Sequence, residues 1–264
     1  MNFTRPFRIL IFIICCFVVY DGFAQTVEMV YKPFIQTAQL FANGNQQALP
    51  VYTLNSSDRL ELEFDDLEGS VKSYYYTFVL CDYNWVPIDI SPFDYIKGFT
   101  QNRISIYRYS SIALTRYTHY QAFLPDRNSA PTKSGNYLLK VFLDGDTSKL
   151  AFTKQMLVLD PKAAVSGAVV QPFSAQLFQT HQKLKMLVNI GGINSFSAAQ
   201  QVKVVILQNN RWDIAQRDIP PTFVRGNLLE YNSESNSIFP AGKEWRWLDL
   251  RSFAVSPLSP VVLH

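Results

Sequence analysis

Acidic side chains gather around a tryptophan in the first third of the sequence. Asp82, Asp89 and Asp94 flank Trp85, and a pair of carboxylates is what glycosidases use to cleave a sugar linkage. The flat apolar face of an indole ring can stack on a sugar. The stretch 82–94 also contains prolines, however, and aspartates beside prolines commonly accept hydrogen bonds within turns. We therefore favour a turn-forming role for these acids and keep carbohydrate binding as the alternative.

Histidine and cysteine, the other common catalytic residues, are sparse. The histidines are His119, His181 and His264, and no HExxH, HxH or CxxC spacing occurs, so no zinc site is indicated. The sequence also lacks GxSxG, GxxxxGK[ST] and GxGxxG motifs, which are common signatures of hydrolases and nucleotide-binding proteins. Cys81 ends an apolar run and is predicted to be a small buried hydrophobe. We predict no enzymatic activity, no cofactor, no metal and no small-molecule substrate.

The N-terminus has the layout of a signal peptide. Arg5 and Arg8 precede the 12-residue apolar run from Ile9 to Tyr20, and Gly22-Phe23-Ala24 supplies small residues for cleavage. Twelve apolar residues are too few to span a membrane. We therefore predict that residues 1–24 direct export. A retained anchor and lipidation at Cys16 are the alternatives.

Composition limits the class of partner. The chain has 264 residues with 24 Lys+Arg against 21 Asp+Glu, and 17% of its residues are charged. Average soluble domains carry about 25% charged residues. Because no long run of like charge occurs either, nucleic acid is not expected as a partner. The length allows two domains, each with its own core.

Short β-rich segments separated by turns indicate an all-β fold. Asp144-Gly145-Asp146, for example, is predicted to join two of them as a tight hairpin. In residues 25–160 the predicted strands are Ile35–Phe41, Val51–Leu54, Arg59–Phe64, Lys72–Cys81, Arg103–Tyr109, Tyr117–Leu124, Gly135–Leu143 and Leu150–Leu159. A series of this kind predicts an antiparallel β-sandwich.

A tyrosine near the end of this domain narrows the class. Ser134-Gly135-Asn136-Tyr137 opens the penultimate strand, and Leu139 follows two residues after the tyrosine. In immunoglobulin-like sandwiches a tyrosine at this place closes the corner between two strands, and a core residue follows it. We predict an immunoglobulin-like sandwich over residues 25–160.

The segment Asp160–Ala164 (DPKAA) is predicted to be a linker to a second β region, residues 161–264. Its predicted strands are Lys183–Ile190, Gln201–Asn209, Phe223–Tyr231 and Trp245–Leu250, with a turn at Asn209–Trp212. Four or five strands leave sheet edges uncovered. We therefore expect this second domain to be incomplete.

Tyrosine, tryptophan and arginine recur between residues 74 and 128. These residue types are enriched at binding hot spots, although many of them must also build the core. The candidate partner-binding residues in this stretch are Trp85, Tyr95, Lys97, Phe99, Arg103, Tyr107, Arg108, Asp126 and Arg127.

Several motifs, taken in order, resemble one exported family. They are Asp65–Gly69 (DDLEG), Tyr74–Thr77 (YYYT), Asp82 with Trp85, Asp94–Phe99 (DYIKGF), Tyr117–Tyr120 (YTHY), Leu124–Asn128 (LPDRN) and Ser134–Tyr137 (SGNY). This series is similar to the N-terminal domain of the type IX secretion system plug proteins of Bacteroidota over residues 27–160. Residues 173–253, including Trp245–Arg251 (WRWLDLR), resemble the start of the family's second region, and the sequence departs from the family after Phe253.

The resemblance implies a periplasmic protein without catalytic activity. Its partner would be the outer-membrane translocon barrel of the type IX secretion system, whose pore it would seal when no cargo is present. The alternative from the residues alone is a secreted carbohydrate-binding or hydrolase-accessory module that uses Trp85 with Asp82 and Asp89.

Overall fold

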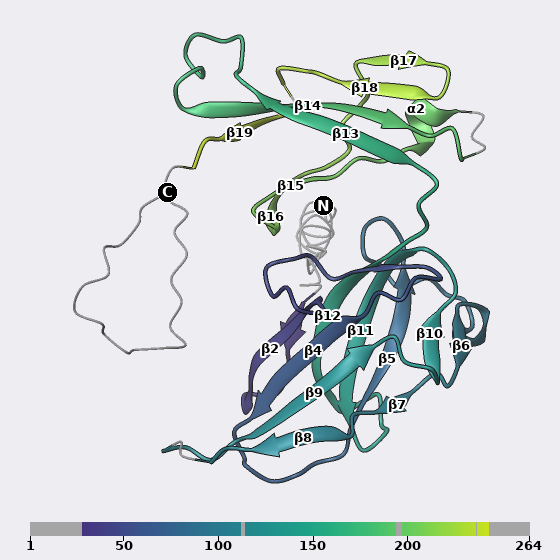
Figure 1. The fold of residues 1–264 in the computed structure, drawn as a ribbon, viewed down its shortest axis with the longest axis vertical. Coiled ribbons are helices and arrows are strands. Elements are labelled where there is room, and N and C mark those ends of the chain that lie inside the picture. Colours follow the sequence, from purple (N-terminus) through teal and green to yellow (C-terminus); the bar gives the residue numbers. More distant parts are fainter. Residues whose placement is uncertain (1–27, 112–113, 194–196, 236, 243–264) are drawn as a thin grey trace, which may run out of the picture. The chain divides into compact units, whose positions relative to one another are not determined.

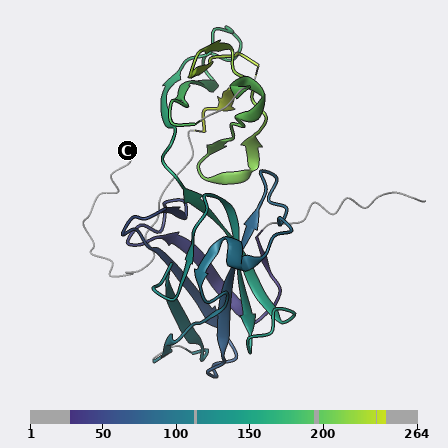
Figure 2. The same ribbon diagram turned by 90° about the vertical axis from the view of Figure 1, so that its right-hand side faces the viewer.

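The computed structural model of the chain describes residues 28–111, 114–193, 197–235 and 237–242. The chain divides between Asp160 and Pro161 into two compact units (Figures 1 and 2). The regular structure of the described part is strand, apart from a 3-10 turn, η1 (Pro92–Asp94), and a four-residue helix, α2 (Ala198–Gln201). The predicted signal peptide and the predicted strand Trp245–Leu250 lie outside the described residues.

The first unit is a sandwich of two sheets. Sheet A has the strand order β1 (Met29–Val30), β12 (Leu150–Leu159), β11 (Gly135–Leu143), β5 (Tyr74–Cys81) and β7 (Asn102–Arg103), and β3 (Val51–Thr53) also pairs with β12. Sheet B has the order β2 (Ile35–Ala42), β4 (Leu60–Asp66), β9 (Thr118–Leu124) and β8 (Ile106–Tyr109). A separate ribbon pairs β6 (Ile96–Gly98) with β10 (Ser129–Pro131). The prediction of an all-β sandwich is confirmed.

The strand order is that of an immunoglobulin-like fold. Immunoglobulin sandwiches place strands A, B, E and D in one sheet and C, F and G in the other. In sheet B, β2, β4, β9 and β8 occupy the positions of strands A, B, E and D. In sheet A, β5, β11 and β12 occupy those of C, F and G. The strand β3 runs parallel to β12, which differs from the purely antiparallel prediction.

The corner predicted at Tyr137 is confirmed. Its hydroxyl donates a hydrogen bond to the carbonyl oxygen of Lys133 at 2.9 Å, which ties the start of β11 to the loop before it. Leu139, two residues further on, is fully buried. Because the side chains of a strand alternate between its two faces, one residue closes the corner and the next on that face enters the core.

The hairpin predicted at Asp144-Gly145-Asp146 is also confirmed. It joins β11 to β12, which pair as antiparallel neighbours. Asp144 has a φ of 58° and Gly145 a φ of 72°. Aspartate and glycine are residues that adopt this left-handed backbone at low cost, so the turn follows from local residue types.

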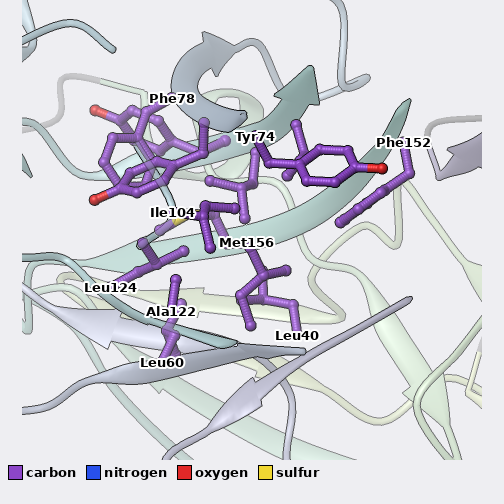
Figure 3. Close-up of a cluster of buried hydrophobic side chains, with 14 of the residues drawn as sticks. Leu40, Leu60, Tyr74, Phe78, Ile104, Ala122, Leu124, Phe152 and Met156 are labelled. Atoms are coloured by element: carbon purple, nitrogen blue, oxygen red, sulfur yellow. The ribbon is translucent and has the colours of Figure 1, made fainter. Parts of the chain in front are cut away.

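Aromatic side chains fill the space between the sheets (Figure 3). Phe64 of β4 stacks on Tyr120 of β9 with ring centroids 5.0 Å apart and meets Tyr74 edge-on at 4.9 Å. Phe152 of β12 contacts Phe64 from the opposite sheet at 5.0 Å. The core-facing residues of β5, as their alternate spacing predicts, are Tyr74, Tyr76, Phe78 and Leu80.

A buried carboxylate connects sheet B to sheet A. Asp66, at the end of β4, is fully buried and accepts hydrogen bonds from the Tyr74 hydroxyl and the Lys72 Nζ, both at 2.7 Å. The backbone N–H of Glu68 donates to its other oxygen at 2.9 Å. The Tyr120 hydroxyl in turn accepts from the backbone N–H of Lys72 at 2.7 Å. A buried charge is tolerated when it is paired and hydrogen-bonded in this way.

The second unit is built from shorter strands. One sheet has the order β13 (Ala164–Val170), β14 (His181–Asn189), β18 (Leu228–Tyr231) and β17 (Phe223–Arg225), and β19 (Ile238–Pro240) also pairs with β14. A hairpin joins β15 (Ile206–Gln208) to β16 (Arg211–Gln216). The predicted turn in this hairpin is confirmed, since Asn209 and Asn210 both have the positive φ that a tight two-residue turn requires.

Three strand predictions are wrong in detail. The stretch Gln201–Asn209 is not one strand, because α2 ends at Gln201 and β15 begins at Ile206. The predicted strand over residues 223–231 is a hairpin, since Gly226 turns the chain with a φ of 57°. The predicted strand over residues 103–109 divides between β7 in sheet A and β8 in sheet B. Apolar periodicity alone does not locate where a chain turns or changes sheet.

We expect Tyr74→Phe to lower the free energy of unfolding of the first unit by about 1.5–3 kcal/mol. The substitution removes a hydrogen bond to a buried carboxylate, and hydrogen bonds to charged groups are worth about that much. Urea denaturation followed by circular dichroism measures the change. Tyr75→Phe is the matched control, because Tyr75 lies on the other face of β5. Equal effects of the two variants would contradict the role given to Asp66.

Alkaline pH is expected to destabilise the first unit. Burial raises the pKa of Tyr74, Tyr76 and Tyr137, and the hydrogen bond to Asp66 raises the pKa of Tyr74 further. Above pH ~10 the unfolded chain loses these protons while the folded chain keeps them. Their contribution to stability is therefore complete below pH ~10 and is lost as pH rises beyond it.

Tyrosinate absorbance in the near ultraviolet and far-ultraviolet circular dichroism, recorded together during an alkaline titration, check this expectation. The tyrosinate absorbance of the three buried residues should appear only as the circular dichroism signal is lost. Ionisation of these three tyrosines in a chain that stays folded would refute it.

Candidate partner-binding surface

The chain leaves the sandwich between β5 and β7, and we call residues 82–99 the excursion. It begins with a turn in which Asp82 Oδ1 accepts hydrogen bonds from the backbone N–H groups of Asn84 and Val86, at 2.8 and 2.9 Å. Asp82 therefore has the turn-forming role favoured from the sequence. Trp85 takes a positive φ of 66° in this turn, and it is only 4% exposed.

After the turn the chain lies against the edge of β5. The backbone N–H of Ile88 donates to the carbonyl oxygen of Leu80 at 3.0 Å, and Pro87 forms a bridge with Cys81. The 3-10 turn η1 then leads to Tyr95, which is buried and packs edge-on against Tyr137 with ring centroids 6.0 Å apart. These contacts fasten the excursion to the sandwich.

The end of the excursion pairs with the loop after β9. Gly98, in β6, has a φ of +91°, and a Cβ at this position would lie 2.1 Å from the carbonyl oxygen of Asn128. Phe99 donates its backbone N–H to that same oxygen at 2.7 Å. Asp126 organises the facing loop by accepting from the backbone N–H groups of Asn128 and Ser129, at 2.7 and 2.8 Å.

Asn102 ties this loop to the core. Its amide nitrogen donates to the two carboxylate oxygens of Asp126, at 2.9 and 2.8 Å, and to the hydroxyl of Tyr76 at 3.2 Å. Tyr76 is a buried residue of β5. The ribbon of β6 and β10 is therefore connected to sheet A through side chains.

Exposed apolar side chains gather on the excursion. Phe93 is 77% exposed and Phe99 is 65% exposed, which is unusual for a residue type most often found inside proteins. Together with nearby exposed cations they form what we call the excursion surface. Its residues are Val86, Ile88, Ile90, Phe93, Lys97, Phe99 and Arg127.

The structure separates the candidate residues into groups. Those exposed at the ribbon are Lys97, Phe99 and Arg127. Trp85 and Tyr95 are buried, so their rings are not available for contact with a partner. The remaining candidates are the half-buried Asp126, which holds the loop, and Arg103, Tyr107 and Arg108, which lie on β7 and β8.

The residues on β7 and β8 are exposed but engaged with neighbouring strands. Arg103 Nη2 donates to the Ser73 hydroxyl at 3.1 Å, and the ring of Tyr107 lies 6.1 Å from that of Tyr120 in β9. Figure 1 shows β8 at the edge of sheet B and the β6–β10 ribbon away from it, beyond β5. They therefore form a second exposed group, separate from the ribbon.

The burial of Trp85 removes the platform that the carbohydrate alternative required. A tryptophan that is almost fully enclosed offers no face on which a sugar can stack. That interpretation of Trp85 was wrong, because the spacing of acids around a tryptophan does not reveal whether the ring points outward or inward.

Sequence reasoning missed the exposed residues Val86, Ile88, Ile90 and Phe93. Val86, Ile88 and Ile90 occupy alternate positions, and that pattern is typical of a half-buried strand. It therefore predicts burial where the structure has exposure. Phe93, between a proline and an aspartate, carries no signal of its own.

The outer face of sheet B carries a polar cluster centred on His119. Its Nδ1 lies 2.7 Å from Asp65 Oδ1, and its Nε2 lies 3.9 Å from Glu63 Oε1. Burial and the neighbouring Glu61 raise the pKa of the Glu63 carboxyl. Among the described residues no group of histidine, cysteine and acidic side chains is arranged to hold a metal ion.

Cys81 is a free, buried cysteine, as predicted. Burial raises the pKa of its thiol to about 11, so at neutral pH it is not the thiolate that nucleophilic chemistry requires. Within the described ranges, no helix has both the length and the apolar character needed to cross a membrane.

Comparison with known families decides the class of the first unit. Residues 35–160 match the family described as the type 9 secretion system plug protein 1st domain. This range, which we call the plug domain, is the part of the chain that is similar to the family. The matched range begins with β2 and ends one residue after β12, so the plug domain includes every strand of both sheets except β1.

The chain is also similar to a solved structure, a hypothetical protein from Parabacteroides merdae ATCC 43184. The two share 27% sequence identity with a TM-score of 0.77, and the match covers 83% of this chain and 55% of the other. This chain therefore spans little more than half the length of that protein. A search of curated proteins found no match.

The motifs that resemble the family include residues that connect separate segments of the plug domain. Asp66 and Tyr74 meet across the sandwich, Asp82 closes the turn that contains Trp85, and Gly98 lets the ribbon approach the loop after β9. Each of these contacts needs a specific side chain or, at Gly98, the absence of one. The resemblance therefore lies largely in residues that hold the plug domain together.

We expect Gly98→Ala to destabilise the plug domain by about 2–5 kcal/mol. Left-handed backbone costs an alanine about 1–2 kcal/mol, and displacing the Asn128 carbonyl adds an overpacking cost of about 1–3 kcal/mol. Gly44→Ala is the matched control, because Gly44 has a φ of +80° but no described atom within 4 Å of the place a Cβ would take. Denaturant unfolding compares the two variants. A Gly98 variant as stable as the Gly44 variant would show that the ribbon tolerates a side chain.

Proposed function

We propose that this protein seals the translocon of a type IX secretion system from the periplasmic side when no cargo occupies the pore. The match of the plug protein 1st domain to residues 35–160 carries this proposal. The partner is the outer-membrane barrel of that system. The chain reaches the periplasm through the predicted signal peptide, residues 1–24, whose layout supports export.

The excursion surface is the part of the plug domain that we propose contacts the barrel. Exposed apolar side chains grouped on one segment are candidates for contact with a partner, and aromatic residues are enriched at the centres of interfaces. Phe93 and Phe99 are among the most exposed aromatic side chains of the described first unit. The contacts of Tyr95 and Gly98 hold the surrounding backbone in place.

Charge around this surface is mixed. Lys97, Asp89 and Asp94 are exposed on the excursion, and Arg127 is exposed on the loop that pairs with its end. Interfaces that form and dissociate combine apolar and charged residues, whereas permanent interfaces are larger and more hydrophobic. A plug that must yield to cargo requires a reversible interface, expected to bury about 1,200–2,000 Å² in total.

The proposed role is binding without catalysis. Asp82, one of the acids that suggested chemistry in the sequence, accepts hydrogen bonds within its turn, and the candidate binding residue Asp126 accepts them within its loop. The Cys81 thiol is buried. These arrangements support a domain whose polar groups maintain its shape.

We expect replacement of Phe93 and Phe99 together by serine to reduce co-purification of the protein with the translocon barrel by about tenfold or more. The reason is that loss of a hot-spot aromatic side chain commonly costs more than about 1.4 kcal/mol of binding free energy. Recovery from envelope fractions in mild detergent measures the effect. Tyr109→Ser is the matched control, because Tyr109 is similarly exposed, at 63%, but lies on β8.

A second pair of variants tests the other exposed group. Arg103→Ala and Tyr107→Ala should leave recovery unchanged if the excursion surface is the contact. Lost recovery in these variants, with full recovery of the double phenylalanine variant, would transfer the contact to β7 and β8. Full recovery of all variants would contradict contact through either surface.

A further inference from the structure

The main sheet of the second unit has two edges, and β13 forms one of them. The order of the sheet is β13, β14, β18 and β17 (Figure 1), so β17 forms the other edge. β13 pairs with β14 from Ala164 to Val170 without a shift in register, and all of its residues are exposed. Among the described strands, β14 is the one that pairs with β13. The other side of β13 is therefore a sheet edge.

The other edge strands of the large described sheets are protected. A bare edge can pair with a further strand, and proteins prevent this with short strands, charges, prolines or bulges. β17 includes Arg225, and β19 includes Pro240. In the first unit β1, β3 and β7 have two or three residues each. β8 includes Arg108, and the longer strand β2 contains a register shift.

β13 has none of these features. Its seven-residue sequence, AVSGAVV, has no charged residue and no proline, and no Asp, Glu, Lys or Arg occurs between Lys162 and Lys183. A second strand can therefore approach this edge without burying a charge and without placing like charges opposite each other, both of which are costly. The edge is open to a strand that is uncharged itself.

The sequence of β13 is nearly symmetric about Gly167. Small residues flank the glycine on both sides, and a valine follows two positions away in each direction, at Val165 and Val169. Two copies paired antiparallel about Gly167 would therefore place Val165 of each copy opposite Val169 of the other. Side chains directly opposite each other interact, and β-branched residues pack well on a pleated sheet. β13 is thus complementary to itself.

The two valines lie on the side of the sheet that carries the core of this unit. Val165 lies opposite Val188, which belongs to that core, and Val169 lies opposite Leu184, which packs against it. Opposite residues point to the same side of a sheet. Val165 is nevertheless 67% exposed and Val169 is 66% exposed. A second copy of β13 would give each of them an apolar neighbour.

We propose that β13 pairs antiparallel with β13 of a second copy of this chain, about a two-fold axis at Gly167, so that their main sheets form one continuous sheet. A two-fold interface requires a surface that is complementary to itself, and the uncharged, nearly symmetric sequence of β13 meets this requirement. One pair of seven-residue strands is small beside stable interfaces, which bury about 1,200–2,000 Å². The dimer therefore dissociates on dilution. The proposal is independent of the proposed function.

Sedimentation equilibrium tests the association, on the chain expressed with its own N-terminus and purified from the periplasm. Its weight-average mass should rise from that of a monomer towards that of a dimer between low micromolar and millimolar concentration. Val169→Lys should weaken the association by about tenfold or more, because a lysine on an edge strand opposes pairing. Val224→Lys is the matched control, because Val224 is an exposed valine of β17, at the other edge of the same sheet. It should leave the association unchanged.

Disulfide cross-linking tests the register. Val165→Cys in one chain and Val169→Cys in another would lie opposite each other, within the Cα separation of about 4.4–6.8 Å that a disulfide spans. A mixture of the two variants, with copper phenanthroline as the oxidant, should give a linked dimer. Either variant alone should not, because its two thiols would lie about 13 Å apart along the strands. Cys15 and Cys16 are replaced by alanine, and Cys81 is buried.

Three results would overturn the proposal. The first is a monomer mass over the whole concentration range. The second is association that Val169→Lys and Val224→Lys weaken equally or not at all, which would place the contact away from β13. The third is association without preferential cross-linking in the mixture of Val165→Cys and Val169→Cys, which would exclude pairing about Gly167.

Discussion

The buried carboxylate of Asp66 constrains the whole first unit. A charge removed from water must be matched by donors that arrive with correct geometry, since one left unpaired costs several kcal/mol. The donors come from β5 and from the turn that precedes it: the Tyr74 hydroxyl, the Lys72 ammonium and the Glu68 backbone N–H. Once they are in place, the end of β4 and the start of β5 can no longer shift past each other. The ring of Tyr74 is thereby oriented against Phe64 and Tyr120, so the polar link also organises the aromatic core.

The position of β5 then determines where the excursion lies. The chain leaves β5 through the Asp82 turn and returns along its edge, and Tyr76 of β5 connects through Asn102 to the Asp126 loop. The exposed phenylalanines therefore stand on backbone that is fastened on more than one side. A surface held in this way loses little conformational entropy when a partner binds, which increases affinity without additional contacts. Trp85 has a positive φ, and the backbone at Gly98 passes close to Asn128. Both unfavourable conformations lie where the excursion contacts the rest of the domain, and those contacts hold them in place.

The second unit follows a different principle. The core of its described residues is smaller than that of the plug domain. In its main sheet, Val165 and Val169 of β13 are exposed although they lie opposite strand β14, which contributes to that core. The plug domain encloses its aromatic residues between two sheets, whereas β13 pairs through its backbone and leaves its valines outside. Packing, rather than pairing, is what stabilises a sheet. The two units thus differ in how completely each buries the apolar surface that its strands create.

The pattern of neighbouring residues in the sequence was sufficient to predict much of the first unit's architecture. The alternation in Tyr74–Leu80, the hairpin at Asp144–Asp146 and the corner at Tyr137 could be predicted from residues close in the chain, because strand faces and tight turns depend on neighbours. The direction of Trp85, the exposure of Phe93 and the meeting of Gly98 with Asn128 could not. Each depends on segments distant in sequence that come together only when the sheets pack, so no spacing along the chain encodes it. Residue type and order therefore determined an immunoglobulin-like sandwich and its resemblance to one family, and packing of the two sheets decided which aromatic residues became core and which remained on the surface.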